Sequence, residues 1–252
     1  MSDTNKSGAA AAVTGGAHRA AGRAGQDAAL VDVAAGILVV ADGCGSAPAS
    51  EVGARLAVRL WRAAVGRQQA AGTDLTAAAT WAAARTEVVE ALRALVVATD
   101  ATLAATHLQF TSLVGVVTAT HVVVYVVGDG RCGGVIDATF APGADNAPNY
   151  IAADLVDAGV PGELRVAPRG EAGMLWLGSD GIAELADATP DALTALLGDA
   201  RATCSDERLR RRLEAWARPT ETIDWAAQRV VHTPAALRDD GALAILCWDG
   251  VA

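Results

Sequence analysis

Two apolar runs in this sequence each lead into an aspartate that is followed by a glycine. The first run covers residues 37–41, and the second covers residues 174–178. Short apolar runs bounded by glycine are typical of buried strands, and a carboxylate at a strand end is held rigidly over the cleft that the strands share. Four acidic motifs lie at or near such runs: Gln26-Asp27, Asp42-Gly43, Ser179-Asp180-Gly181 and Arg238-Asp239-Asp240. The pattern predicts one metal site assembled from distant strands.

The composition favours one large hydrophobic core and disfavours polyanionic partners. The chain has 252 residues, 52% of them hydrophobic, and a net charge of -9, which would repel nucleic acid and anionic membranes. The sequence contains neither an apolar stretch typical of a membrane span nor a secretory signal at its start. We therefore expect a cytoplasmic protein with no nucleic-acid or membrane partner. We also expect a flexible segment at residues 1–14 and a single domain over 15–252.

The first acidic pair stands at the outer ends of a predicted hairpin. Residues 28–33 and 37–41 predict two strands joined by a tight turn. Because the two strands of a hairpin are antiparallel, their outer ends meet, which would place Asp27 beside Asp42.

The remaining periodicity predicts an α+β sandwich in which helices flank antiparallel sheets. Helices are expected at 51–70, 75–98, 190–197, 207–217 and 224–231, and strands at 111–118, 121–127 and 242–248. Strict alternation of strand and helix is missing, which argues against a doubly wound parallel sheet. A further carboxylate, Asp129, follows a strand end, and the turn-rich stretch 141–149 predicts an exposed loop that could border a substrate groove.

Carboxylates at these positions favour Mg²⁺ or Mn²⁺, which prefer oxygen ligands. The four histidines lack the spacing of zinc hydrolases, and the four cysteines are dispersed without a C-x-x-C pair. Two divalent ions that share a carboxylate can convert bound water to hydroxide and hold a phosphoryl group for in-line attack. The motifs therefore predict hydrolysis of phosphate esters.

The order of the motifs over nearly the whole chain resembles that of the metal-dependent protein phosphatase (PPM) family, and most of all its bacterial type 2C serine/threonine phosphatases. The segments that carry this resemblance are Ala17-His18, Gln26-Asp27, Asp42-Gly43-Cys44-Gly45-Ser46, Ser50-Glu51-Val52-Gly53-Ala54-Arg55, Val127-Gly128-Asp129-Gly130, Ser179-Asp180-Gly181 and Asp239-Asp240.

The resemblance implies a four-layer α-β-β-α sandwich of two antiparallel sheets flanked by helix pairs, with two Mn²⁺ or Mg²⁺ ions at one end. The ligands it implies are Asp27, Asp42, Gly43, Asp129, Asp180 and Asp239. On this analogy Asp42 bridges both ions and the Gly43 carbonyl binds one of them, while Asp180 and Asp239 complete the other. Asp27 acts through bound water, and Asp129 helps Asp180 to hold a third ion.

Two positions depart from the family pattern. Cys44 stands where many members have a histidine that serves as general acid, which leaves His18 and a metal-bound water as candidate proton donors. We interpret Cys44 as a small turn residue or an oxidation-sensitive thiol in preference to a nucleophile. Gly22 stands where many relatives have a phosphate-binding arginine, and Arg23 or Arg19 could take that role with a bidentate grip.

The leading hypothesis is a phosphatase that removes phosphate from serine and threonine side chains of proteins by direct attack of a metal-activated water. Its partners would be phosphorylated proteins, a cognate kinase and a separately encoded regulator. The alternative is a catalytically weak signalling module of the same fold that binds a kinase or phosphoprotein; the presence of Asp42, Asp180 and Asp239 argues against it. A Ca²⁺-binding structural domain would need a loop of closely spaced ligands, which the sequence lacks.

Overall fold

The longest β-branched runs of the sequence form the middle of one antiparallel sheet. The structure is a computed structural model that describes residues 6–143, 148–156 and 159–249. The strands of this first sheet are, in spatial order, β2 (Ala28–Asp32), β3 (Ile37–Ala41), β4 (Ser112–Val117), β5 (His121–Val127) and β8 (Glu163–Pro168). All residues of β3 and β4 are buried because both faces of the sheet are covered.

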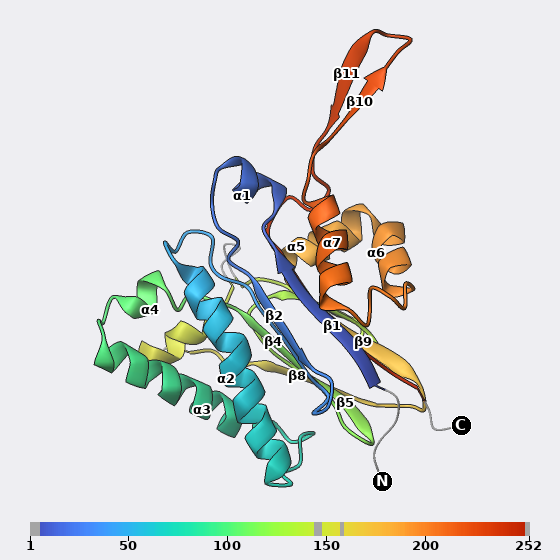
Figure 1. Ribbon diagram of the computed structural model, residues 1–252. Helices are drawn as coiled ribbons and strands as arrows, with labels where there is room; N and C mark the ends of the chain where they lie inside the picture. The colour runs from blue at the N-terminus through green and yellow to red at the C-terminus, as the bar shows by residue number, and fades with distance from the viewer. Residues whose placement is uncertain (1–5, 144–147, 157–158, 250–252) are drawn as a thin grey trace.

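A second antiparallel sheet stacks on the first (Figure 1). Its strands are, in spatial order, β1 (Lys6–Val13), β12 (Gly241–Trp248), β9 (Gly173–Gly178), β6 (Gly130–Gly134) and β7 (Ala138–Phe140). Apolar side chains from the inner faces form one core between the sheets, with Leu38 and Val124 from the first sheet and Leu175 and Leu246 from the second. This burial is the main source of stability at the centre of the molecule.

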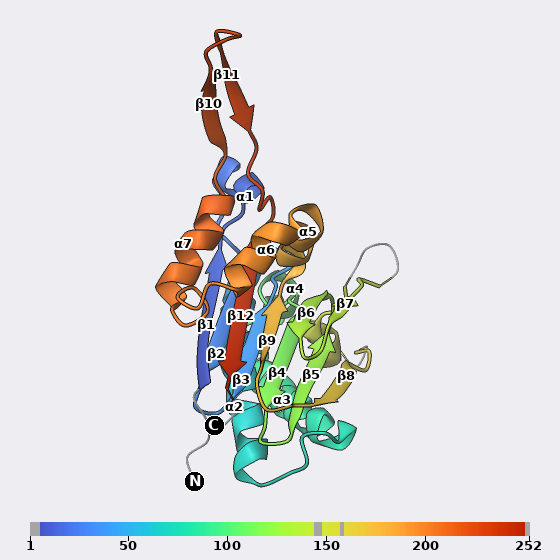
Figure 2. The ribbon, with the colours of Figure 1, turned by 90° about the vertical axis from the view of Figure 1, so that its right-hand side faces the viewer.

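Helices cover the outer face of each sheet (Figures 1 and 2). The first sheet is covered by α2 (Ser50–Ala70) and α3 (Ala78–Ala98), and the second by α5 (Asp180–Ala188), α6 (Pro190–Leu197) and α7 (Asp206–Trp216). Trp61 and Trp81 pack with Tyr125 beneath the first pair, and Leu209 and Leu213 bury the apolar stripe of α7 on the second sheet. The expected four-layer α+β sandwich is confirmed.

Short elements connect or extend these layers. They are α1 (Gly16–Ala20), α4 (Leu103–Thr106), the 3₁₀ helix η2 (Ile151–Val156), and the paired strands β10 (Thr220–Asp224) and β11 (Arg229–Thr233). Within the described ranges, no helix combines the length and the apolar character needed to cross a bilayer.

The N-terminal prediction was wrong for residues 6–13, which form β1 in place of a flexible segment, while residues 1–5 lie outside the described part. β1 pairs with β12 along its whole length, from Lys6 opposite Trp248 to Val13 opposite Gly241. Alanine and glycine give little apolar periodicity, yet small side chains suit this position: a Cβ on Gly8 would lie 2.7 Å from the Ile245 carbonyl oxygen. A domain that began at residue 15, as expected, would therefore leave out β1, which is an edge strand of the second sheet.

The predicted helix over 224–231 was also wrong. β10 and β11 form a hairpin there, in which Ile223 lies opposite Val230 and Asp224 lies opposite Arg229. The β-branched residues pair across the two strands, with Thr222 opposite Val231 and Ile223 opposite Val230, and Gln228, with φ of 48°, helps the chain reverse. The other predicted helices and strands were found with shifts of at most three residues at their ends. The elements β6, β7, β8, α1, α4, α5 and η2 were not foreseen.

Candidate metal centre

Strand register brings the acidic motifs together at one end of the stacked sheets. Ala28 pairs with Ala41, so Asp27 and Asp42, which flank this pair, emerge side by side. In the second sheet Gly178 pairs with Leu243, which places the Asp180 and Asp240 segments at the same end. Distant parts of the sequence thus meet because antiparallel neighbours share their ends.

A cavity of about 180 Å³ lies at this end of the molecule. All six residues predicted as metal ligands line it: Asp27, Asp42, Gly43, Asp129, Asp180 and Asp239. The rest of its described lining consists of His18, Gln26, Cys44, Gly45, Thr111, Pro148, Tyr150 and Asp240. Donor atoms in this lining are mostly oxygens, which is the set that Mg²⁺ and Mn²⁺ prefer.

The carboxylates raise one another's pKa values. Burial raises the pKa of Asp42 well above its usual range, and the charges of Asp27 and Asp180 raise it further. Burial likewise raises the pKa of Asp27, with Asp180 adding to the shift, and burial together with Asp180 raises the pKa of Asp129 to about 6. Several carboxylates this close disfavour one another's charge unless a cation lies among them.

Two local features fit a divalent ion in this cavity. One carboxylate oxygen of Asp27, Oδ2, is buried and has no hydrogen-bond partner among the described residues, although Asp27 is only 7% exposed. At Gly43 the chain turns so tightly that a Cβ would lie 2.7 Å from the Gln26 carbonyl oxygen and 2.8 Å from Ser50 Oγ. An unsatisfied buried oxygen is costly, and a metal ion or its bound water would satisfy it.

Asp240 ties the segments of the site together. Its Oδ1 accepts from the Gly15 amide at 2.8 Å, and its Oδ2 accepts from the Gln26 amide at 2.7 Å and from His18 Nδ1 at 2.8 Å. Ligand atoms of His18, Asp239 and Asp240 lie within 4.8 Å of one another, so this trio could also hold an ion. The oxygens of Asp240 accept these three hydrogen bonds, whereas Asp239 accepts one from a described residue, the Asp240 amide at 2.8 Å, which leaves Asp239 more open to an ion.

His18 is held by Asp240 at the wall of the cavity. It lies on α1 and lines the cavity, and the bond from Nδ1 to Asp240 fixes the orientation of the ring. No hydrogen bond to Nε2 is present among the described residues. A histidine that a carboxylate orients in this way is the usual arrangement for general acid–base work.

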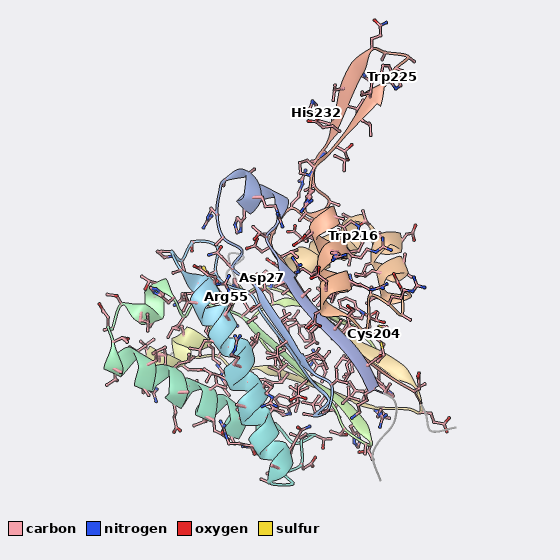
Figure 3. All side chains as sticks on the ribbon, in the orientation of Figure 1. Asp27, Arg55, Cys204, Trp216, Trp225 and His232 are labelled. Atoms are coloured by element: carbon pink, nitrogen blue, oxygen red, sulfur yellow. The ribbon has the colours of Figure 1, made fainter. Side chains whose placement is uncertain are left out.

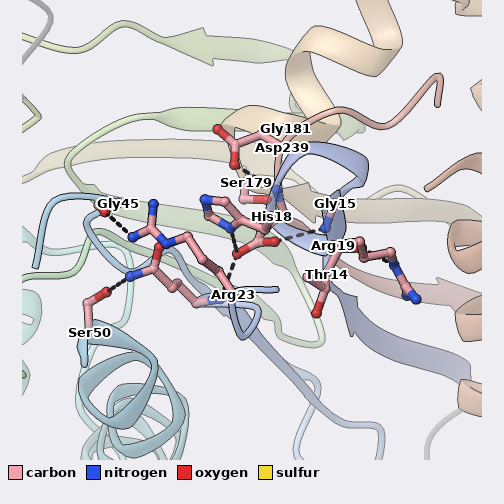
Figure 4. Close-up of polar contacts among 12 residues, drawn as sticks. Thr14, Gly15, His18, Arg19, Arg23, Gly45, Ser50, Ser179, Gly181 and Asp239 are labelled. Atoms are coloured by element: carbon pink, nitrogen blue, oxygen red, sulfur yellow. Dashed lines mark hydrogen bonds and ion pairs between the residues drawn. The ribbon is translucent and has the colours of Figure 1, made fainter. Parts of the chain in front are cut away.

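Neither candidate phosphate-binding arginine lines the cavity. Arg23 donates through Nη2 to the carbonyl of Gly45 at 2.6 Å, and Gly45 does line the cavity, so Arg23 stands at its rim. Arg19 donates through Nε to the carbonyl of Thr14 at 2.7 Å and extends to the opposite side from Arg23 (Figure 4). Of the two arginines, Arg23 is therefore the better placed to reach a phosphate group in the cavity.

Cys44 belongs to a small polar group at the cavity wall. Its Sγ lies 3.1 Å from Ser46 Oγ, and its backbone amide donates to the Gln109 carbonyl at 2.9 Å. Burial works against the thiolate, but hydrogen bonds from Ser46 and Tyr150 outweigh it and lower the pKa of Cys44. The pKa of Tyr150 is raised by the burial of its own side chain and by its hydrogen bond with the Cys44 thiol.

Two residues that line the cavity, Thr111 and Tyr150, were missed in the sequence, and Ser179 was named in a motif but given no role. Thr111 lines the cavity, donates its amide to the Asp42 carbonyl at 2.8 Å, and has a buried Oγ1 without a hydrogen-bond partner among the described residues. Its position just before β4 could have revealed it. Tyr150 follows the turn-rich stretch and gives no local signal. Ser179 braces Asp180 by accepting from the Ala242 amide at 3.0 Å. Residues 144–147 of the expected loop lie outside the described residues.

The sequence model of the family described as "Protein phosphatase 2C" matches residues 14–218. No curated protein matches the chain significantly. The match covers the strands and helices that carry Asp27, Asp42, Asp129 and Asp180, and it ends before β10.

Solved structures of bacterial phosphatases share the fold at low sequence identity. The catalytic domain of the serine/threonine phosphatase PstP, in complex with 2 manganese ions, is 16% identical, with a TM-score of 0.62 over 97% of this chain and 99% of that one. PppA, a regulatory component of the type VI secretion system (T6SS) in Pseudomonas aeruginosa, is 15% identical, with a TM-score of 0.60 over 98% and 100%. Stp1 from Staphylococcus aureus is 17% identical, with a TM-score of 0.58 over 100% and 96%. Together with the family match, the fold places this chain in the protein phosphatase 2C family of metal-dependent phosphoprotein hydrolases.

Proposed function

We propose that this protein is a Mn²⁺- or Mg²⁺-dependent phosphatase that cleaves phosphoserine and phosphothreonine in proteins at a binuclear centre. The observation that carries the proposal is the convergence of Asp27, Asp42, Asp129, Asp180 and Asp239 on one cavity. When bound, two divalent ions would activate a water molecule as nucleophile and neutralise the charge of the phosphoryl group.

Asp42 is the carboxylate best placed to be shared between two ions. Its carboxylate interacts with those of both Asp27 and Asp180. The Gly43 carbonyl would add an oxygen ligand beside it. Asp180 and Asp239 would hold the second ion, Asp27 would orient bound water through its unpaired oxygen, and Asp129 would help Asp180 to hold a third ion.

His18 would supply the proton that the departing alkoxide needs. The carboxylate of Asp240 holds Nδ1, which leaves Nε2 for the leaving oxygen. Serine and threonine alkoxides are poor leaving groups, so this proton matters for the natural ester. Cys44 then acts as a small residue of the cavity wall, with no covalent role.

Arg23 would bind the phosphate from the rim of the cavity. Its guanidinium uses Nη2 for the Gly45 carbonyl, and its other donors, which bond to no described residue, could meet two phosphate oxygens. Arg19, held on the far side, would play no direct part. Phosphorylated proteins are the expected substrates, with a cognate kinase as the enzyme that supplies them, and a cytoplasmic location stays an expectation from composition.

The test is the hydrolysis of p-nitrophenyl phosphate and of a phosphothreonine peptide with Mn²⁺, with EDTA, and with Asp42→Asn. We expect Mn²⁺ to support turnover of both substrates and EDTA to abolish it. Absence of turnover above the Asp42→Asn control on both substrates would favour the alternative, a signalling module of the same fold that binds a kinase or phosphoprotein without hydrolysis.

A further inference from the structure

The β10–β11 hairpin projects from the body of the protein as a two-stranded arm (Figures 1 and 2). Among the described strands, β10 and β11 pair only with each other. Every residue of β11 is exposed, as are four of the five residues of β10. Both outer edges of the arm therefore carry backbone groups that no described strand pairs with.

The arm concentrates exposed apolar side chains. Nine large hydrophobic residues are exposed in the described part of the chain, and four of them lie on this short arm: Ile223, Trp225, Val230 and Val231. Trp225, which Figure 3 labels on the arm, is 80% exposed. Ile223 is 55% exposed. A lone two-stranded hairpin in water is only marginally stable, and a projecting apolar patch of this kind marks a surface that binds protein.

The charges of the arm are paired within it. His232 lies 3.0 Å from Glu221 on the opposite strand, and Arg229 lies 3.7 Å from Asp224. Ile223 and Val230 lie directly opposite each other on the same face as Glu221 and His232. The apolar pair thus lies beside Glu221 and His232 on one face, and the arm carries no excess of positive charge, so it suits an apolar protein segment better than a polyanion.

The base of the arm adjoins the metal-centre cavity. Thr233 precedes Asp239 by only six positions, a span of at most about 20 Å. Between them, the Leu237 amide donates to the Trp216 carbonyl at 3.0 Å, and the Leu237 carbonyl accepts from the Gly16 amide at 3.0 Å. These bonds anchor the arm to α7 and to α1, the helix that carries His18. A protein bound at the cavity would lie within reach of the arm.

We propose that the β10–β11 hairpin docks the phosphoprotein substrate by accepting an extended segment of it as a third strand, a role that rests on the proposed phosphatase function. Main-chain hydrogen bonds to an open edge would supply affinity, and apolar side chains at alternate positions would pack on Ile223, Val230 and Trp225. The geometry sets the spacing. The segment would lie roughly 6 to 12 residues from the phosphorylated side chain. The lower bound corresponds to the span of at most about 20 Å from the cavity to the arm, and the upper bound adds the length of one strand, about 17 Å.

The probes are fluorescent phosphothreonine peptides with a segment of alternating valine and threonine placed about nine residues from the phosphothreonine. A matched peptide carries serine and glycine in that segment. Two further peptides are N-methylated at odd or at even positions of the segment, so that one of them cannot donate to the arm. Binding is measured by anisotropy in the Asp42→Asn background, where hydrolysis does not consume the probe.

We expect the valine peptide to bind at least about tenfold more tightly than the serine-glycine peptide. One N-methylated peptide, and the double substitution Ile223→Ala with Trp225→Ala, should each remove that preference. The matched control is Val97→Ala on α3, because Val97 is 81% exposed and lies outside the arm. Equal binding of the two peptides, or a preference that survives the double substitution, would overturn the proposal, as would an arm that instead dimerises the protein in sedimentation.

Hydrolysis of p-nitrophenyl phosphate by the unmodified protein distinguishes a failure of the docking role from a failure of the phosphatase function. Turnover without any peptide preference would refute the docking role and leave the phosphatase function standing. A peptide preference without turnover would refute the phosphatase function while showing that the arm binds extended segments.

Discussion

The metal-centre cavity and the β10–β11 hairpin break the usual rules of burial in opposite directions. At the cavity, charged side chains are buried, with Asp27 only 7% exposed; on the hairpin, apolar side chains are in water, with Trp225 80% exposed. Buried charge calls for a counter-charge, and exposed apolar surface calls for a protein surface. Each region therefore indicates the chemistry of the partner that would complete it.

The two regions also differ in how strongly the fold depends on them. The aspartates stand at the ends of strands that belong to the cores of both sheets, so their mutual repulsion weakens the metal-free protein. The hairpin packs mainly on itself, so its side chains add little to the stability of the body. Substitutions at the cavity should change activity and stability together, whereas those on the hairpin should change neither stability nor the chemical step.

The largest effect is expected for Asp42→Asn. Turnover of p-nitrophenyl phosphate with Mn²⁺ should fall at least about 10³-fold, because the shared ligand is lost. In EDTA the same variant should melt a few degrees higher than the parent, since a buried like charge is gone. Asp137→Asn, whose side chain is 71% exposed, is the control. A variant with parental activity, or one that melts lower in EDTA, contradicts this prediction.

Replacing His18 with glutamine should separate substrates by leaving group. Hydrolysis of a phosphothreonine peptide should slow by about 10²-fold or more, because the alkoxide needs a proton. Hydrolysis of p-nitrophenyl phosphate should change only a few fold, because p-nitrophenolate leaves without one. His121→Gln serves as the control. Equal losses on both substrates would show that His18 positions the site and does not donate the proton.

Adding Mn²⁺ should stabilise the folded protein. At a free concentration about 100 times the dissociation constant, binding adds about 2.7 kcal/mol, which corresponds to roughly 5 to 10 °C in Tm for a chain of this size. Differential scanning calorimetry measures the shift, and Asp42→Asn should reduce it by more than half. A parent protein whose Tm does not respond to Mn²⁺ would argue against a metal centre in this cavity.

The metal-free protein should lose stability as pH rises from about 4, the unfolded-state pKa of an aspartate, to about 7. The folded-state pKa of Asp129 is raised to about 6. A raised carboxyl pKa stabilises the fold while the group is protonated, and that contribution disappears as pH rises through the folded value. The change in unfolding free energy from this group is of order 2 kcal/mol. Urea denaturation in EDTA measures it, and Asp129→Asn should flatten the slope. A stability that instead increases over this range would refute the electrostatic account.

The smallest effect is expected for Trp225→Ala. Its unfolding free energy should differ from the parent by less than about 0.5 kcal/mol, because the side chain is in water. Trp81, which is 1% exposed, is the buried counterpart, and Trp81→Ala should cost about 3 to 5 kcal/mol. A large loss at Trp225 would mean that the arm packs on the body in solution.

Much of the site was predictable because its ligands follow apolar runs. Asp42 and Asp180 follow short apolar runs bounded by glycine, which are typical of buried strands, and the antiparallel hairpin brings Asp27 beside Asp42. The role of Asp240 was not predictable in detail, because its partners Gly15, His18 and Gln26 lie more than 200 positions away in the sequence. Such contacts follow from sheet order, which local patterns do not encode.

The two wrong predictions of secondary structure, at residues 6–13 and 224–231, have a common physical origin. Alanine fits a strand, a helix or a loop, so the alanine-rich sequence of β1 gives no local signal for a strand. Its pairing with β12 is what makes it one. In the hairpin, Ile223, Val230 and Val231 satisfy helical spacing as well as cross-strand pairing. Short apolar sets of this kind are decided by tertiary context and not by propensity.

The most direct test of the central claim is the electron paramagnetic resonance spectrum of the protein loaded with two equivalents of Mn²⁺. Two ions that share the Asp42 carboxylate should give an exchange-coupled spectrum, and Asp42→Asn should abolish the coupling. A spectrum of isolated Mn²⁺ in the unmodified protein, or no bound Mn²⁺ at all, would contradict a binuclear centre.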